Sequence, residues 1–147
     1  MKLKHVSSLK IVMPFIEMEL DFSDNDKDAA WELCVELLTR VALQPLDKDK
    51  GDEKAALSSI YSLFETTRSI VKSHGRGAKQ TSRIALIVLN KIIRPFTTKW
   101  HTEIEGYENI PNKKEEFRAE LLQLQRQLSE YARVLCEIAG VEDVLNE

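Results

Sequence analysis

A stripe of apolar residues in the last third of the chain constrains the fold most. Its members alternate four and three residues apart, which is the spacing of one face of a helix that packs along its length against other helices. They are Phe117, Leu121, Leu124, Leu128, Tyr131, Leu135 and Ile138. Asn112 and Glu115 precede the stripe at capping-box spacing, and Gly140 follows it. The pattern predicts one long helix that ends at Gly140 and needs partner helices.

Three earlier segments also have helical spacing. The first opens with N-cap candidates at residues 23–25 and is expected to end near Pro45, and the second is terminated by Gly75. The third holds residues 84–89, an apolar run typical of a helix in the middle of a domain, and Pro95 is expected to kink or end it. Apolar residues that recur in the first segment include Trp31, Cys34, Val35 and Leu38.

Helices joined by short connections pack most simply side by side in alternating directions. We therefore expect an all-α fold, an up-and-down four-helix bundle with a kinked third helix, in a single domain of residues 23–147. Residues 1–22 are expected to form an N-terminal extended or β arm, because apolar and acidic residues alternate over residues 16–22 with the period of a strand. Such a strand either pairs through its edge with a copy or a partner, or lies extended over the helices.

Composition narrows the class of protein. The 147 residues, 43% hydrophobic and 31% charged, suit one folded domain of ordinary size. Cys34 and Cys136 lie in apolar helical patterns without metal-ligand or redox spacing, so we expect two buried thiols that act as small hydrophobic residues. The histidines also lack ligand spacing, and we expect no metal and no cofactor. The longest apolar run is far shorter than the roughly 20 residues of a membrane span, so we expect a cytoplasmic protein without membrane contact.

Residues 66–102 are strongly basic. They contain eight Lys and Arg residues and no Asp or Glu, whereas the whole chain has a net charge of −3. Clustered cations focus positive potential and predict a site for an anion, such as nucleic-acid backbone, a nucleotide or an acidic protein surface. The candidate anion-binding residues are Arg68, Lys72, His74, Arg76, Lys79, Arg83 and Lys99. The alternative is that these helices only pack against the acidic remainder of the chain, so that opposite charges offset one another.

The turn at residues 73–77 leads into the third helix. Unpaired backbone N–H groups at the start of that helix, beside Lys79 and Arg83, could hold a phosphate group. The glycines of the turn lack the spacing of a Walker loop or of a dinucleotide-binding fingerprint. A plain connection between two helices explains the same residues.

Arg94 and His101 are separated by six residues. This spacing resembles the Arg-x(4–6)-His motif of HEPN ribonucleases, which are also small helical bundles. The resemblance implies that His101 transfers protons and that Arg94 stabilises the phosphate, at paired sites of a dimer. The sequence departs from the family at Pro95, where the family usually has a polar residue, so a shared helix face depends on how the helix passes the proline. The alternative is a kinked amphipathic segment with Phe96 and Trp100 packed inward and His101 at the surface.

Four stretches together resemble a family of small uncharacterised bacterial all-helical proteins. They are DAAWEL at residues 28–33, GDEKAAL at 51–57, RPFTTKWH at 94–101 and IAGVED at 138–143. The resemblance spans nearly all of the chain after the N-terminal arm. It implies one intact bacterial domain in a stress or antiviral locus, and it implies no activity, cofactor or catalytic residue.

The sequence shows no complete set of catalytic residues at a recognisable spacing, which favours a non-catalytic helical interaction module. We expect an accessory subunit that binds a partner protein or an anionic ligand through residues 66–102 and that forms a homo-oligomer. One alternative is a HEPN-like, metal-independent ribonuclease that uses Arg94 and His101. The other is a helical protein that binds nucleic acid without catalysis.

Overall fold

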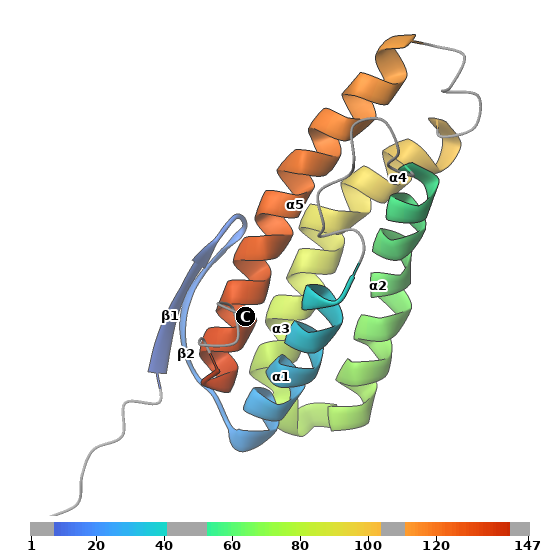
Figure 1. The fold of residues 1–147 in the computed structure, drawn as a ribbon. Coiled ribbons are helices and arrows are strands. Elements are labelled where there is room, and N and C mark those ends of the chain that lie inside the picture. Colours follow the sequence, from blue (N-terminus) through green and yellow to red (C-terminus); the bar gives the residue numbers. More distant parts are fainter. Residues whose placement is uncertain (1–7, 41–52, 104–110, 142–147) are drawn as a thin grey trace, which may run out of the picture.

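The computed structural model describes residues 8–40, 53–103 and 111–141, and this part of the chain is mostly helical (Figure 1). The chain begins with a β-hairpin made of β1 (Ser8–Met13) and β2 (Ile16–Asp21). The helical elements that follow are α1 (Asp24–Leu38), α2 (Glu53–His74), the 3-10 turn η2 (Gly75–Ala78), α3 (Lys79–Ile87), the π-helix η3 (Val88–Ile93), α4 (Arg94–Glu103) and α5 (Pro111–Ala139). The first helix ends at Leu38, ahead of Pro45, which lies outside the described residues.

The hairpin decides between the two expectations for the N-terminal residues: the strand expected over residues 16–22 forms as β2, and it pairs within the chain instead of lying as an extended arm. Its strands are antiparallel, and Met13 lies opposite Ile16, so Pro14 and Phe15 alone form the turn. Proline fixes φ at the first turn position, and Phe15 has φ 68, the left-handed value that the second position of a type II turn requires. The alternating segment at residues 16–22 therefore finds a strand partner within the chain.

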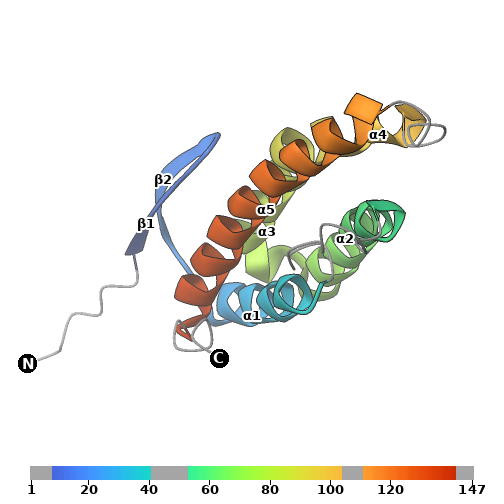
Figure 2. The ribbon, with the colours of Figure 1, turned by 45° about the horizontal axis from the view of Figure 1, so that its top comes forward.

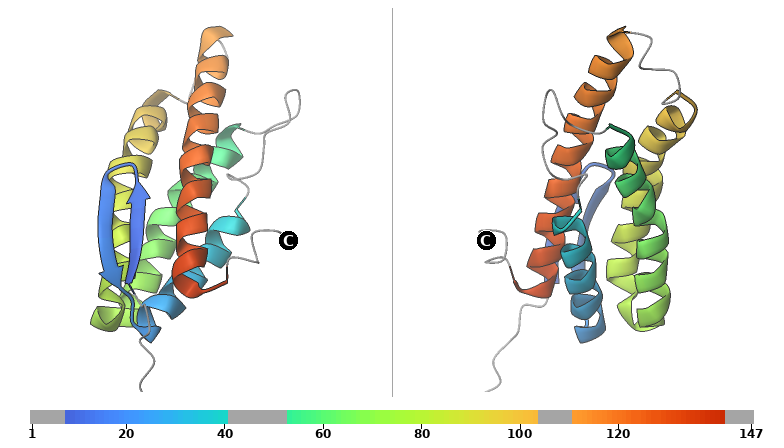
Figure 3. Two further views of the ribbon diagram at one scale, coloured as in Figure 1. Left: turned by 90° about the vertical axis from the view of Figure 1, so that its left-hand side faces the viewer. Right: turned by 45° about the vertical axis from the view of Figure 1, so that its right-hand side comes forward.

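The hairpin packs on the helices and contributes to their core. β1 contacts α5 and β2 contacts α3, and both strands stand on one side of the helices in Figures 2 and 3. The inward side chains of Ile11 and Ile16 are only 1% and 2% exposed. The expected all-α, up-and-down four-helix bundle is therefore wrong, because a two-stranded sheet covers part of the helical assembly. Alternation in both strands gives the hairpin one apolar face, whose burial is favourable.

The third predicted helix does not end at Pro95. Instead, α3, η3 and α4 follow one another as a continuous rod (Figure 1). In an α-helix the ring of Pro95 would collide with the carbonyl group four residues earlier. The helix avoids this collision because the wider turns of the π-helix η3 lie just before the proline. Accordingly, the N–H of Arg94 donates to the carbonyl oxygen of Leu89, five residues back. The helical run is also not buried on every side, since Leu86 is 42% exposed.

The apolar stripe of α5 forms the centre of the core, as predicted. Each of its seven residues is at most 3% exposed. Gly140 ends the helix with φ 77, and the N–H of Val141 donates to the carbonyl oxygen of Cys136 at 2.9 Å. This is the hydrogen bond of a Schellman cap, for which glycine is preferred because it has no side chain to strain the left-handed conformation.

Two expectations for α1 need correction. Trp31 and Val35 are 42% and 37% exposed, because α1 turns Ala30, Leu33 and neighbouring residues towards the core instead. Cys34 and Cys136 are fully buried as predicted, but they are joined in a disulfide between α1 and α5. They are 102 residues apart in sequence, with a Cα–Cα distance of 6.1 Å. Only the packing of α1 against α5 brings them together.

Candidate functional site

A surface groove of about 570 Å³ lies between α2 and α4. Its lining combines two arginines with several hydroxyl groups and one carboxylate. The lining residues are Ser58, Tyr61, Ser62, Phe64, Glu65 and Arg68 of α2, with Arg94, Thr97 and Thr98 of α4. Residues three and four apart share a helix face, so each helix presents a line of side chains along the groove.

Arg94 is oriented in this groove by neutral partners. Its guanidinium lies over the ring of Phe64, 4.9 Å from the ring centroid. Its Nε and Nη2 atoms donate to Oδ1 of Asn90 at 3.2 and 3.1 Å. Within the described ranges no carboxylate pairs with this guanidinium. The side chain is thus positioned while its charge remains available to an anion, for which a planar guanidinium is well suited.

His101 lies beside Tyr61 on the side of α4 that faces α2. The two rings meet edge to face, with their centroids 5.8 Å apart. The hydroxyl of Tyr61 donates to the carbonyl oxygen of Thr97 at 3.0 Å, which ties α2 to α4. Trp100, the residue before His101, points into the core and is fully buried, whereas His101 is exposed. Phe96 is also buried, so Phe96 and Trp100 pack inward and His101 lies at the surface, as the alternative to the HEPN-like motif predicts.

Most of the other predicted anion-binding residues are exposed and lack a carboxylate partner. Arg68 lines the groove together with Arg94. Lys72 lies one turn further along the same face of α2, towards the connection to α3. Among the residues that the structure describes, no ion pair involves Arg68, Lys72, Arg76, Lys79 or Arg83. We call these five residues and Arg94 the basic surface.

Two predicted anion-binding residues instead pair with carboxylates of the same chain. The ammonium group of Lys99 donates to Glu116 and to Glu120 of α5, both at 2.5 Å. These hydrogen bonds raise the pKa of Lys99 above its ordinary value. His74 pairs with Glu32 of α1, 2.5 Å from Nε2 to Oε2. Lys99 and His74 therefore join helices and do not belong to the basic surface.

The predicted phosphate cradle at the start of α3 already holds an anion from the chain itself. The backbone N–H of Thr81 donates to Oδ1 of Asp26 at 2.9 Å, and the hydroxyl of Thr81 donates to the Asp26 carbonyl oxygen at 2.8 Å. Asp26 is only 3% exposed and also accepts from the backbone N–H of Ser23. A carboxylate thus occupies the position that the sequence suggested for a phosphate.

Comparison with known proteins adds no functional assignment. No family model, curated protein or solved structure matches the chain. Among the described residues, no group of three or more His, Cys, Asp or Glu side chains is placed to hold a metal ion. In the same part of the chain, no helix has the length and apolar character needed to cross a membrane.

The sequence pointed to the arginines of the groove but not to its hydroxyl groups. Tyr61 is 37% exposed and lines the groove. Ser58 and Thr98 had no signal of their own. Ser58 is three residues before Tyr61, and Thr98 is four residues after Arg94. These spacings become informative only once α2 and α4 are known to be neighbours.

Proposed function

We propose that the chain is a non-catalytic interaction module that binds an anionic partner through this groove and the basic surface, to which the groove contributes Arg68 and Arg94. The observation that supports this most is the pair of groove-lining arginines, Arg68 and Arg94, neither of which has a carboxylate partner in the described residues. Cations that serve only to join helices are expected to be paired internally, as Lys99 is. An exposed cluster without such pairs focuses positive potential outward.

The lining of the groove suits an anion that also accepts hydrogen bonds. The hydroxyl groups of Ser58 and Thr98 line the groove together with the two arginines. Phosphate and carboxylate oxygens accept from both kinds of donor. Glu65 also lines the groove, and its negative charge would disfavour a densely charged ligand close to α2.

Binding of two anionic probes tests the proposal. Fluorescence anisotropy with a labelled single-stranded RNA oligonucleotide and with a polyglutamate peptide would show which class of anion is bound. Arg68→Glu and Arg94→Glu are expected to weaken binding of the preferred probe, because each change places a negative charge in the groove. Arg126→Glu is the matched control, since Arg126 is exposed on α5, outside the groove lining. Equal binding by all variants would contradict the proposal.

The second candidate is a metal-independent ribonuclease that uses Arg94 and His101. The observation in its favour is that these side chains contact neighbouring aromatic rings of α2, Phe64 and Tyr61, whose centroids are 6.4 Å apart. Incubation with RNA in the presence of a chelator tests this candidate. Cleavage by the wild type that His101→Ala abolishes would support it, and intact RNA after incubation with the wild type would count against it.

A further inference from the structure

A second groove, of about 530 Å³, lies between α2 and α1 and borders the first groove, because Ser62 and Glu65 line both. Its α1 wall is formed by Trp31, Glu32, Val35 and Glu36, and its α2 wall includes Glu65 and Ile70. Trp31 and Val35 are 42% and 37% exposed, although both are large apolar residues. They are one helical turn apart, so their side chains form a short apolar ridge along the groove. Apolar ridges of this kind are typical of protein-binding surfaces.

The charge of this groove is opposite to that of the basic surface. Its lining includes three glutamates and no lysine or arginine. Glu36 pairs with Arg40 and Glu32 with His74, whereas Glu65 has no ion-pair partner in the described part of the chain. An apolar ridge bordered by carboxylates matches a segment whose apolar residues are flanked by lysine or arginine.

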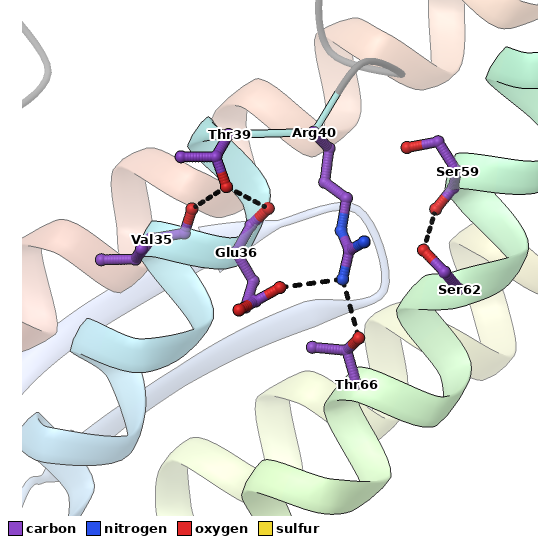
Figure 4. Close-up of polar contacts among 7 residues, drawn as sticks. All are labelled: Val35, Glu36, Thr39, Arg40, Ser59, Ser62 and Thr66. Atoms are coloured by element: carbon purple, nitrogen blue, oxygen red, sulfur yellow. Dashed lines mark hydrogen bonds and ion pairs between the residues drawn. The ribbon is translucent and has the colours of Figure 1, made fainter.

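The chain itself shows how a guanidinium is held between these two helices. Arg40 extends from the end of α1 towards α2, and its Nη2 donates to Oε1 of Glu36 at 2.9 Å and to Oγ1 of Thr66 at 2.7 Å (Figure 4). Both acceptors also line the groove. Acceptors for a cation are thus contributed by α1 and by α2, and Ser62 lies on the same side of α2 further along the groove.

We propose that the groove between α1 and α2 binds a basic amphipathic helix of a partner protein. Apolar residues of that helix pack on Trp31 and Val35, and its lysine or arginine side chains reach Glu65 and the indole face of Trp31. This groove shares only Ser62 and Glu65 with the first groove, so one chain can hold a basic helix and an anionic ligand side by side.

Intrinsic fluorescence provides a local probe of this binding. The chain has two tryptophans, and Trp100 is fully buried, so a ligand in this groove acts mainly on the emission of Trp31. The probe is a synthetic helical peptide with leucine and lysine at helical spacing, and a peptide with glutamate in place of lysine is its control. We expect a saturable blue shift with the basic peptide only, because the indole leaves water when it is covered.

Four variants separate the groove from the rest of the surface. Trp31→Ala and Glu65→Lys are expected to weaken binding of the fluorescein-labelled basic peptide by about tenfold each, the loss typical of a contact worth about 1.4 kcal/mol. Leu122→Ala removes an apolar residue that is slightly more exposed than Trp31, 48% exposed on α5, and Glu17→Lys reverses an exposed charge on the hairpin. Both are expected to bind like the wild type. Circular dichroism checks that all four variants keep the helical content of the wild type.

Three results would overturn the proposal. The first is no spectral change at millimolar basic peptide, and the second is equal binding of the acidic peptide. The third is a wild-type homo-oligomer that Trp31→Ala dissociates in sedimentation, since a second copy would then occupy the groove. Arg68→Glu replaces a cation of the first groove by a negative charge near Glu65, so it should weaken anion binding without weakening binding of the basic peptide. Failure of the anion-binding proposal and failure of this one are therefore distinguishable.

Discussion

The carboxylate of Asp26 accepts a hydrogen bond from the backbone N–H of Thr81, 55 residues further along the chain, at 2.9 Å. The same carboxylate completes the capping box of α1, because it accepts from the backbone N–H of Ser23, whose hydroxyl oxygen in turn accepts from the backbone N–H of Asp26. The hydroxyl of Ser23 donates its proton to the carbonyl oxygen of Gly77 at 2.8 Å. One buried side chain thus stabilises the first turn of α1 and the first turn of α3, and it joins the two helices.

We predict that Asp26→Ala lowers the free energy of unfolding by about 3 kcal/mol, because a helix cap and a buried charged hydrogen bond are lost together. Urea denaturation followed by circular dichroism measures this change. Asp28→Ala is the control, since Asp28 lies on the same helix but is exposed. If Asp26→Ala lowers the free energy of unfolding no more than Asp28→Ala does, Asp26 does not stabilise the first turns of both α1 and α3.

The hydroxyl of Tyr131 is buried without a hydrogen-bond partner in the described structure. Burial raises the pKa of this phenol. Replacing it by phenylalanine keeps the ring and removes the unsatisfied polar group, so Tyr131→Phe should raise the free energy of unfolding by about 1 kcal/mol. The expected gain in melting temperature is about 2–4 °C for a protein of this size. A fall in stability would instead indicate that the hydroxyl has a partner, such as a buried water.

The disulfide between Cys34 and Cys136 closes most of the chain into one loop. A cross-link across roughly 100 residues restricts the unfolded chain and can contribute about 4 kcal/mol of stability. Reduction should therefore lower the melting temperature markedly, and thiol titration under denaturing conditions should find two thiols only after reduction. Two reactive thiols in the untreated protein would show that the cysteines are free, and reduction would then leave the melting temperature unchanged.

The contact between Lys99 and Glu116 should make stability depend on pH in the acid range. The hydrogen bond from Lys99 lowers the pKa of Glu116 below its ordinary value of 4.5. A carboxylate with a lowered folded-state pKa stabilises the protein above its unfolded-state pKa, and this stabilisation is lost as the pH falls through the folded-state value. The stability difference between the wild type and Lys99→Met should therefore be larger at neutral pH than at about pH 3. The same difference at both pH values in urea denaturation would contradict this account.

Local sequence patterns predicted the helices better than they predicted the hairpin. The α5 stripe and the Ser23 cap could be found because their signals lie within a few residues of each other. The hairpin was missed at Pro14 and Phe15. A proline within an apolar segment is compatible with a tight turn between two strands, but also with the end of the strand.

The candidate site was only partly predictable for a different reason. The sequence identified an excess of cations in residues 66–102, but it could not separate Lys99, which pairs with α5, from Arg68, which does not. That distinction depends on which helices become neighbours. The occupation of the predicted phosphate cradle by Asp26 is a long-range contact of the same kind.

Salt dependence of binding is the most direct test of the central claim that Arg68 and Arg94 bind an anion. The affinity for single-stranded RNA would be measured over a range of salt concentrations for the wild type, the double variant Arg68→Gln/Arg94→Gln and the control Arg126→Gln. Each phosphate contact contributes about 0.7 to the slope of log affinity against log salt concentration. We predict that the slope for the double variant is shallower by about 1.4 and that the control keeps the wild-type slope. A double variant with the wild-type slope and affinity would contradict the assignment of the groove.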